Sequence, residues 1–207
     1  YFRQNNFEKA INYYEKFLKL TKITDYTGIA YYRLSFCNMM LDKDEKARKL
    51  ISLSNAGNDD IQDDIYAKEE GKKIKEYGWS NDRKILQLAN NFLESAEYDS
   101  VISCLKDKII VLKDKDFEQI ANLHLAEAYL FKKEIKAAEE VLKDIDVKNF
   151  DREKWGVTYF YVISAKVFYK LGKKNDVIKY LKLAEESNDY YFKDKFSAQI
   201  NGLKRKL

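Results

Sequence analysis

The chain has 207 residues, enough to bury a substantial core, and it contains no proline and only 7 glycines, a composition that favours long helices over strands. Its 38 basic and 34 acidic residues give a net charge of +4, and this excess lies in the tail, since residues 1–192 carry 33 of each sign. Charges that alternate along the chain argue against a nucleic-acid-binding face, and no apolar run reaches the roughly 18 residues of a membrane span.

The opening segment, residues 1–20, predicts the second helix of a helical hairpin. Tyr1 occupies the place of an aromatic residue late in a first helix, so we expect the chain to continue upstream with at least one more helix. The apolar stripe of the segment comprises Phe7, Ala10, Tyr14, Phe17 and Leu18. An apolar stripe that lacks most of its partner helix is an exposed apolar patch, and such a patch tends to be buried against other apolar surface. We therefore expect either self-association through this truncated N-terminal helix or a local rearrangement that covers it.

Residues 27–56 predict one complete hairpin. Its first helix carries Leu34 and Ser35, and its second carries Ala47 and Ile51. Asn38 stands where the other pairs have an aromatic residue. Together with the opening segment, this pair forms a predicted N-terminal block, residues 1–58, of one half repeat and one repeat.

Spacing along the chain predicts an additional helix after this block. The equivalent residues Ala10, Ala47, Val101, Ala138 and Val177 are separated by 37, 54, 37 and 39 positions. The step of 54 exceeds a repeat of about 34 residues by enough for one helix. Residues 59–78 fit this helix, because they are acidic at the start and rich in lysine toward the end, as the helix dipole prefers. We expect a half-exposed linker helix there, inserted between two blocks.

Residues 79–188 predict three further hairpins. Apolar residues recur at helical spacing on one face of each helix, and short polar links such as "SAEY", "FKKE" and "LGKK" join the helices. In the middle pair, Ala126 and Ala138 are each followed by a large apolar residue, Tyr129 and Leu142. A small side chain on each helix lets the two axes approach, and the large neighbour fills the groove beside the contact.

This alternation resembles the tetratricopeptide repeat (TPR), whose first helix carries a leucine, a small residue and an aromatic, and whose second carries an alanine and then a large apolar residue. The resemblance covers about three quarters of the chain and is strongest over 117–146 and 157–187. The tryptophan that often opens the motif and the proline that usually closes it are missing. The resemblance implies an all-α fold, a right-handed superhelical solenoid of antiparallel helix pairs, with one inserted helix and a C-terminal capping helix.

The tail, residues 189–207, predicts the capping helix. Its apolar residues recur every three or four positions, at Phe192, Phe196, Ile200, Leu203 and Leu207. Solenoids need such a helix to cover the last apolar face. Because basic residues lie between the apolar ones, a helix on a membrane surface is the alternative.

The sequence shows no constellation for catalysis. His124 is the only histidine, and neither Cys37 nor Cys104 has a second cysteine or a histidine at metal-ligand spacing. We interpret the cysteines as small buried hydrophobic residues and the histidine as a solvated or hydrogen-bonded one. No glycine-rich phosphate loop and no calcium-loop pattern is present. We expect a protein that is not an enzyme and that uses no cofactor and no metal.

A TPR-like solenoid presents the first helix of each pair on its concave face, so the resemblance implies a groove for a protein or a peptide. The residues assigned to the groove are Tyr32, Phe36, Met39, Leu86, Asn90, Leu123, Glu127, Tyr159, Val162, Lys166 and Tyr169. Leu86 stands where the carboxylate clamp of some TPR domains has a lysine, so we expect no clamp. The groove is aromatic and apolar, which suits an amphipathic helix or an extended apolar peptide. We expect several of these aromatic residues to pack between adjacent repeats instead.

The predicted function is a non-enzymatic scaffold for protein–protein interaction. Two alternatives stay open: a regulatory sensor module of a larger protein, switched by a peptide or a flanking domain, and an accessory subunit of an envelope or secretion assembly. The predicted partner is a protein or a peptide, with no nucleic acid and no membrane span. The compartment is open as well, either cytoplasmic or exported after removal of a signal peptide.

Overall fold

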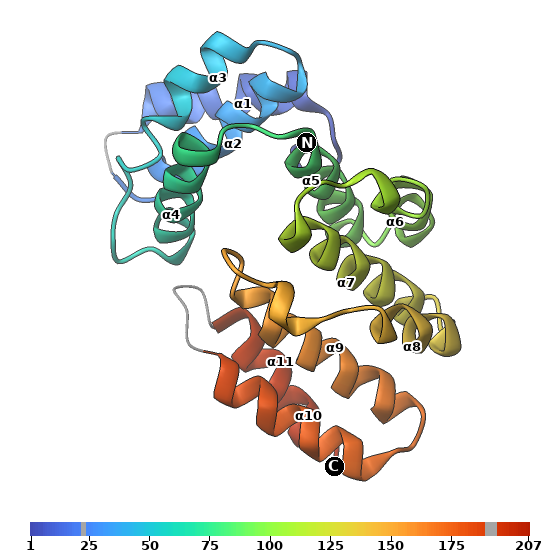
Figure 1. The fold of residues 1–207 in the computed structure, drawn as a ribbon. Coiled ribbons are helices and arrows are strands. Elements are labelled where there is room, and N and C mark those ends of the chain that lie inside the picture. Colours follow the sequence, from blue (N-terminus) through green and yellow to red (C-terminus); the bar gives the residue numbers. More distant parts are fainter. Residues whose placement is uncertain (22–23, 189–193) are drawn as a thin grey trace. The chain divides into compact units, whose positions relative to one another are not determined.

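The computed structural model describes residues 1–21, 24–188 and 194–207. Over these residues the chain contains eleven α-helices, two short 3-10 helices and no strand (Figure 1). The predicted all-α class is confirmed. The chain divides into two compact units, Tyr1–Lys84 and Ile85–Leu207, called unit 1 and unit 2.

Unit 1 is built around α2 (Thr27–Met40). This helix packs against α1 (Phe7–Leu20), α3 (Asp44–Ile51) and α4 (Gln62–Tyr77) (Figure 1). Ten of the 14 residues of α2 are buried. A helix with apolar or small side chains around most of its circumference is usually buried, and α2 has this composition, which explains its position at the centre of unit 1.

The residues before α1 cover part of its apolar stripe. Phe2 is 9% exposed, and its ring makes edge contacts with Phe7, Tyr14 and Phe36 at centroid distances of 6.0–6.4 Å. The ring of Tyr1 lies over α1 as well, 5.0 Å from that of Tyr13. The residues that precede α1 therefore shield part of its apolar stripe from solvent.

Five turns have the same backbone geometry. Each contains one residue in the left-handed region, with φ between 55° and 71°, namely Asn5, Asp42, Ala96, Lys133 or Gly172. The amide of this residue donates to the carbonyl three positions back at 3.1–3.2 Å, and the next amide donates to the carbonyl five positions back at 2.9–3.0 Å. This pair of hydrogen bonds is the Schellman motif, which satisfies the last carbonyls of a helix.

The five turns are in register with the predicted small residues. Five positions after each left-handed residue comes Ala10, Ala47, Val101, Ala138 or Val177, and each of these is 2% exposed or less. The carbonyl that accepts from the amide after the left-handed residue belongs to Tyr1, Asn38, Phe92, Tyr129 or Phe168. In its turn, Tyr1 therefore supplies the same carbonyl acceptor that Phe92, Tyr129 and Phe168, and also Asn38, supply in theirs.

Small residues lie where paired helices meet. In the α2–α3 pair, the hydroxyl of Ser35 donates to the carbonyl of Ala47 over 2.6 Å, inside the core. Ala126 in α7 (Lys115–Phe131) and Ala138 in α8 (Ile135–Lys143) are fully buried, and these two helices pack against each other. A side chain larger than a methyl group or a hydroxyl would force such axes apart.

α4 is the helix that we expected within residues 59–78. It packs on both helices of the preceding pair, α2 and α3, just as α9 (Trp155–Lys170) packs on α7 and α8. α4 is therefore part of the packed core of unit 1. No second helix follows it, because the chain turns at Gly78 (φ 78°) and passes through Trp79 into α5 (Asn81–Glu94).

Asp64 attaches α4 to the start of α2. Tyr26 occupies the N-cap position of α2, and its side chain makes no capping hydrogen bond. The carboxylate of Asp64, 2% exposed, accepts the amides of Ile29 at 2.8 Å and Asn58 at 2.9 Å. A buried carboxylate from a distant helix thus supplies the missing cap, at the end where the helix dipole favours negative charge. Glycine at position 28 makes the approach feasible, since a Cβ there would lie 3.0 Å from Asp64 Oδ1.

Unit 2 contains most of α5 together with α6 (Tyr98–Leu105), the α7–α8 pair, and the pair formed by α9 and α10 (Lys174–Ser187). One continuous apolar cluster runs through these helices. The 3-10 helices η1 (Ile109–Val111) and η2 (Val147–Asn149) lie in the links before α7 and α9.

The C-terminal helix α11 (Asp194–Lys204) packs against α9 and α10. Phe196, Ile200 and Leu203 are buried there, at 9% exposure or less. The assignment of Leu207 to the same stripe is wrong, because the helix ends at Lys204 and Leu207 is 40% exposed. The predicted stripe residue Phe192 lies outside the described residues.

Candidate functional site

The residues assigned to the groove are divided between the two units, and most of them are buried. Tyr32, Phe36 and Met39 belong to unit 1, and the other eight belong to unit 2. Eight of the eleven side chains are buried: Tyr32, Phe36, Met39, Leu86, Leu123, Glu127, Tyr159 and Val162. Asn90, Lys166 and Tyr169 are half-buried and keep surface that a partner can touch.

In unit 1 the inserted helix covers the predicted groove face of α2. The ring of Tyr32 meets that of Tyr66 in α4 edge-on, with centroids 5.7 Å apart. Phe36 is fully buried and meets Trp79 in the same way at 5.0 Å. These side chains therefore form the surface of α2 against which α4 and the link after it pack.

In unit 2 the structure brings Glu127, Tyr159 and Lys166 together between α7 and α9. The carboxylate of Glu127 accepts a hydrogen bond from the hydroxyl of Tyr159 and, at 3.0 Å, one from Lys166 Nζ. Burial and the Glu127 charge raise the pKa of Tyr159 well above its ordinary value of 10, so the phenol keeps its proton and remains a donor. This polar cluster ties two neighbouring first helices to each other.

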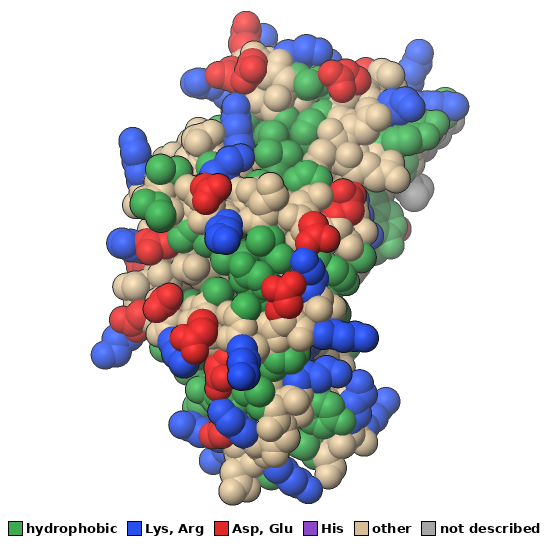
Figure 2. Space-filling view, turned by 90° about the vertical axis from the view of Figure 1, so that its right-hand side faces the viewer, with side chains coloured by type: hydrophobic (Ala, Val, Ile, Leu, Met, Phe, Trp, Pro, Cys, Tyr) green, Lys and Arg blue, Asp and Glu red, His purple; other side chains and the backbone are tan. Residues whose placement is uncertain are grey.

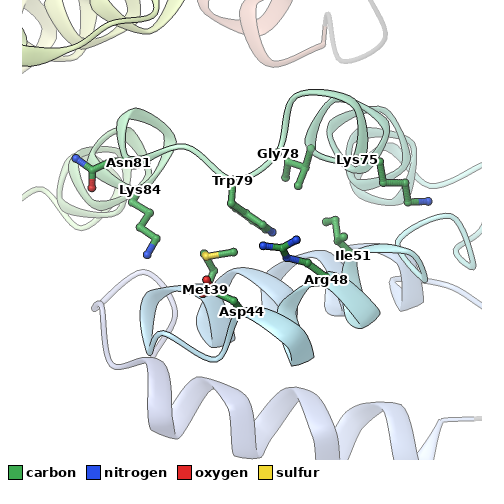
Figure 3. A pocket seen from close by; sticks show the side chains of 10 residues that line it. Met39, Asp44, Arg48, Ile51, Lys75, Gly78, Trp79, Asn81 and Lys84 are labelled. Carbon is green, nitrogen blue, oxygen red and sulfur yellow. The ribbon is translucent and has the colours of Figure 1, made fainter.

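A cleft of about 540 Å³ opens in unit 1 beside α3 and α4 (Figure 3). Its walls come from the end of α2, from α3, from the end of α4, from the link after α4 and from the start of α5. The lining residues are Met39, Asp44, Arg48, Ile51, Ile74, Lys75, Gly78, Trp79, Asn81 and Lys84.

Local sequence explains how Trp79 reaches the cleft. α4 ends at Gly78, whose amide donates to the carbonyl of Ile74 at 2.8 Å, and its positive φ is a conformation that glycine adopts freely. The chain turns back there, so the indole of Trp79 points from the link toward Met39 and Arg48 (Figure 3). Sequence reasoning missed this residue, although one of only 2 tryptophans directly after a helix-ending glycine is a visible signal.

The cleft carries an excess of positive charge. Arg48, Lys75 and Lys84 line it against the single carboxylate of Asp44. Lys84 lies 3.5 Å from the carboxylate of Asp42, which is exposed to solvent. On the face drawn in Figure 2, positive and negative side chains are interspersed. The local excess distinguishes the cleft from that surface.

The groups that catalysis uses are scattered in the described part of the chain. Burial raises the pKa of the Cys37 thiol to about 12 and raises that of Cys104 as well, which keeps both as unreactive thiols at neutral pH. His124 is buried, 5% exposed, rather than solvated. Among the described residues, no group of three or more histidine, cysteine or acidic side chains is arranged to hold a metal. No helix in the same residues is long and apolar enough to cross a membrane.

Comparison with known proteins adds no relative, since no family model, no curated protein and no solved structure matches the chain.

Proposed function

We propose that the chain is a non-enzymatic scaffold for protein–protein interaction, built from TPR-like helical hairpins that form a right-handed superhelical stack within each unit. The observation that carries this proposal is the recurrence of one turn, in one register, at five places along the chain. The same turn at the same distance from a buried alanine or valine is what a helical repeat requires. Repeat proteins of this kind present extended surfaces for partners.

The surface that supports this role best lies in unit 2. Tyr169 and Lys166 are half-buried on α9, and Asn90 is half-buried on α5. The amine of Lys166 also lies 5.8 Å from the centre of the Phe131 ring, which is 49% exposed. Exposed aromatic rings beside a cation are typical of recognition surfaces for peptides and helices.

Affinity capture with the 207-residue chain tests this function. The wild-type chain should retain a stoichiometric protein partner from the cells that produce it, and Tyr169→Glu should lose that partner while its circular dichroism stays unchanged. Tyr13→Glu is the matched control, because Tyr13 is 59% exposed on α1 and far from α9 in the sequence. Capture that survives Tyr169→Glu would refute this surface, and absence of any stoichiometric partner would refute the scaffold function.

A further inference from the structure

The cleft in unit 1 exists because α4 has no second helix. The equivalent residues on either side of α4 are separated by 54 positions, whereas the other steps are 37 to 39. α4 packs on α2 and α3, and the chain then leaves it through Gly78 and Trp79. Part of the side of α3 and α4 therefore stays open as the cleft.

Trp79 brings a hydrogen-bond donor to this cleft without an acceptor. Its indole Nε1 is shielded from solvent and meets no acceptor among the described residues. An indole N–H can only donate, so a buried one without an acceptor is unfavourable until an acceptor arrives. The ring itself is well held, since it packs on Phe36 and on the cluster that includes Ile51 and Ile74.

Arg48 brings a second donor to the same point. Its side chain rises from α3, and its guanidinium lies beside the indole nitrogen of Trp79 (Figure 3). Neighbouring lysines on α3 are paired, Lys46 with Glu15 and Lys49 with Glu45, each at 2.7 Å. Arg48 forms no ion pair with any described residue. Two adjacent donors, one of them charged, define a place for an anionic acceptor.

We propose that this cleft binds an acidic segment of a partner protein, with a glutamate or aspartate side chain received by Arg48 and Trp79. This inference rests on the proposed scaffold function and names the partner chemistry of a site separate from the α9 surface. Arg48 is exposed, so a small movement of its side chain opens the indole nitrogen to an oxygen that both donors share. A carboxylate matches the guanidinium geometry and accepts from both groups.

The walls of the cleft favour a peptide over a free anion. Met39, Ile51 and Ile74 form apolar surface next to the two donors. Lys75 and Lys84 flank them and add long-range attraction for negative charge. The volume lies within the range of about 300–1,000 Å³ that is usual for ligand clefts. An acidic residue beside an aliphatic one satisfies the donors and the apolar wall together.

Trp79 can report binding by its own fluorescence. Trp155→Phe leaves Trp79 as the sole tryptophan of the chain. This protein should be titrated with a short acetylated and amidated peptide of alternating glutamate and leucine, and we expect a saturable change in emission that weakens as salt is added. The same peptide with glutamine in place of glutamate should bind at least about tenfold more weakly, because the charged hydrogen bonds are lost.

Three variants locate the site, with affinity measured by calorimetry and folding checked by thermal melts. Arg48→Gln and Trp79→Phe, which keeps an aromatic ring, should each weaken binding of the glutamate peptide at least about tenfold. Lys49→Gln, the same change of charge on the same helix but outside the cleft, should stay within about twofold of the parent. An equal loss in Lys49→Gln would overturn the proposal in favour of general charge attraction.

Two other ligands test whether the cleft recognises an acidic side chain, a free anion or the carboxylate at a chain end. Inorganic phosphate binding as tightly as the glutamate peptide would overturn the proposal and make the cleft a small-anion site. A leucine peptide whose only carboxylate is its C-terminus should bind weakly, and tight binding of that peptide would contradict recognition of acidic side chains. Failure of the glutamate peptide together with partner capture that depends on Tyr169 would refute the cleft and leave the scaffold function standing.

Discussion

The two units share one turn geometry but hold their helices by different means. In unit 2, consecutive pairs follow each other at 37 to 39 residues and share one apolar cluster. In unit 1, the extra helix α4 has a short apolar face and places two carboxylates, Asp64 and Glu70, in its buried surface. Unit 2 buries carboxylates as well: Asp116 accepts from the amides of Asp151, Arg152 and Glu153 in a link. Glu127 joins α7 to α9, but those two helices also share the apolar cluster. A helix that lacks a full apolar stripe is thus fixed by buried charge, and this gives it a defined position.

The largest effect is expected at Asp64. Asp64→Ala removes one buried and one partly buried hydrogen bond to a charged group, so the amides of Ile29 and Asn58 lose their acceptor. We expect a loss of about 3–5 kcal/mol in the stability of unit 1. Hydrogen exchange should show faster opening of α2 and α4 while α7 and α9 keep their protection. Asp63→Ala, at an exposed position one residue away, should change stability by less than about 0.5 kcal/mol. Equal loss of protection in both units of Asp64→Ala would contradict the view that Asp64 stabilises unit 1 alone.

A pH-dependent effect is expected at Glu70. Burial alone would raise its pKa, but Arg83 and Lys73, each 2.8 Å from its oxygens, hold the pKa below the ordinary value of 4.5. The stabilisation is therefore present above pH 4.5 and disappears as the pH falls through the lowered pKa. Glu70→Gln should cost about 2–3 kcal/mol at pH 7 by urea unfolding.

This difference between Glu70→Gln and the wild type should shrink as the pH falls below 4.5, because the wild-type carboxyl is then protonated too. Glu69→Gln is the control, since Glu69 is partly exposed and forms an ion pair with Lys72 at the surface. A difference that stays constant from pH 7 to pH 3 would show that the charge of Glu70 is not what holds α4.

In unit 2, the matching test replaces a small contact residue. Ala138→Phe should overpack the meeting point of α7 and α8 and cost about 1–3 kcal/mol, because Ala138 is fully buried. Lys136→Phe places the same ring on an exposed position of the same helix and should have little effect. A thermal melt of Ala138→Phe that matches the wild type would contradict the assigned register.

The smallest effect is a gain of stability at a turn. Lys133 has φ 65°, which is unfavourable for a side chain with a Cβ, and the equivalent position 172 is a glycine. Lys133→Gly should therefore stabilise the chain by about 1 kcal/mol, and Gly172→Ala should destabilise it by a similar amount. The two changes can be read from the midpoints of urea unfolding. A loss of stability in Lys133→Gly would mean that this turn differs from the one at Gly172.

Sequence periodicity predicted the helices and the buried small residues, but it could not predict the shared turn. The left-handed position is occupied by asparagine, aspartate, alanine, lysine and glycine in turn. No single residue type marks this position, so the sequence gives no signal for it. The spacing of 54 residues did predict α4, since a count of positions is independent of residue type.

The candidate site was less accessible to sequence reasoning. Periodicity shows which face of α2 is apolar but not which element covers it, so Tyr32 and Phe36 were assigned to a groove although α4 and Trp79 bury them. Arg48 looked like one more cation on an exposed helix. The glycine before Trp79 marks a turn in the sequence, but only the structure shows that this turn directs the indole toward Arg48.

Amide hydrogen exchange resolved at single residues tests the central claim, that one hairpin turn recurs along the chain, most directly. We predict strong protection at the amides that donate to the carbonyl five positions back, those of Asn6, Lys43, Glu97, Glu134 and Lys173. The amides that follow three of them, at Asp44, Tyr98 and Ile135, have no acceptor among the described residues and should exchange freely. Five protected donors with these unprotected neighbours would support the repeat, and free exchange at Lys43, Glu97 or Glu134 would contradict it.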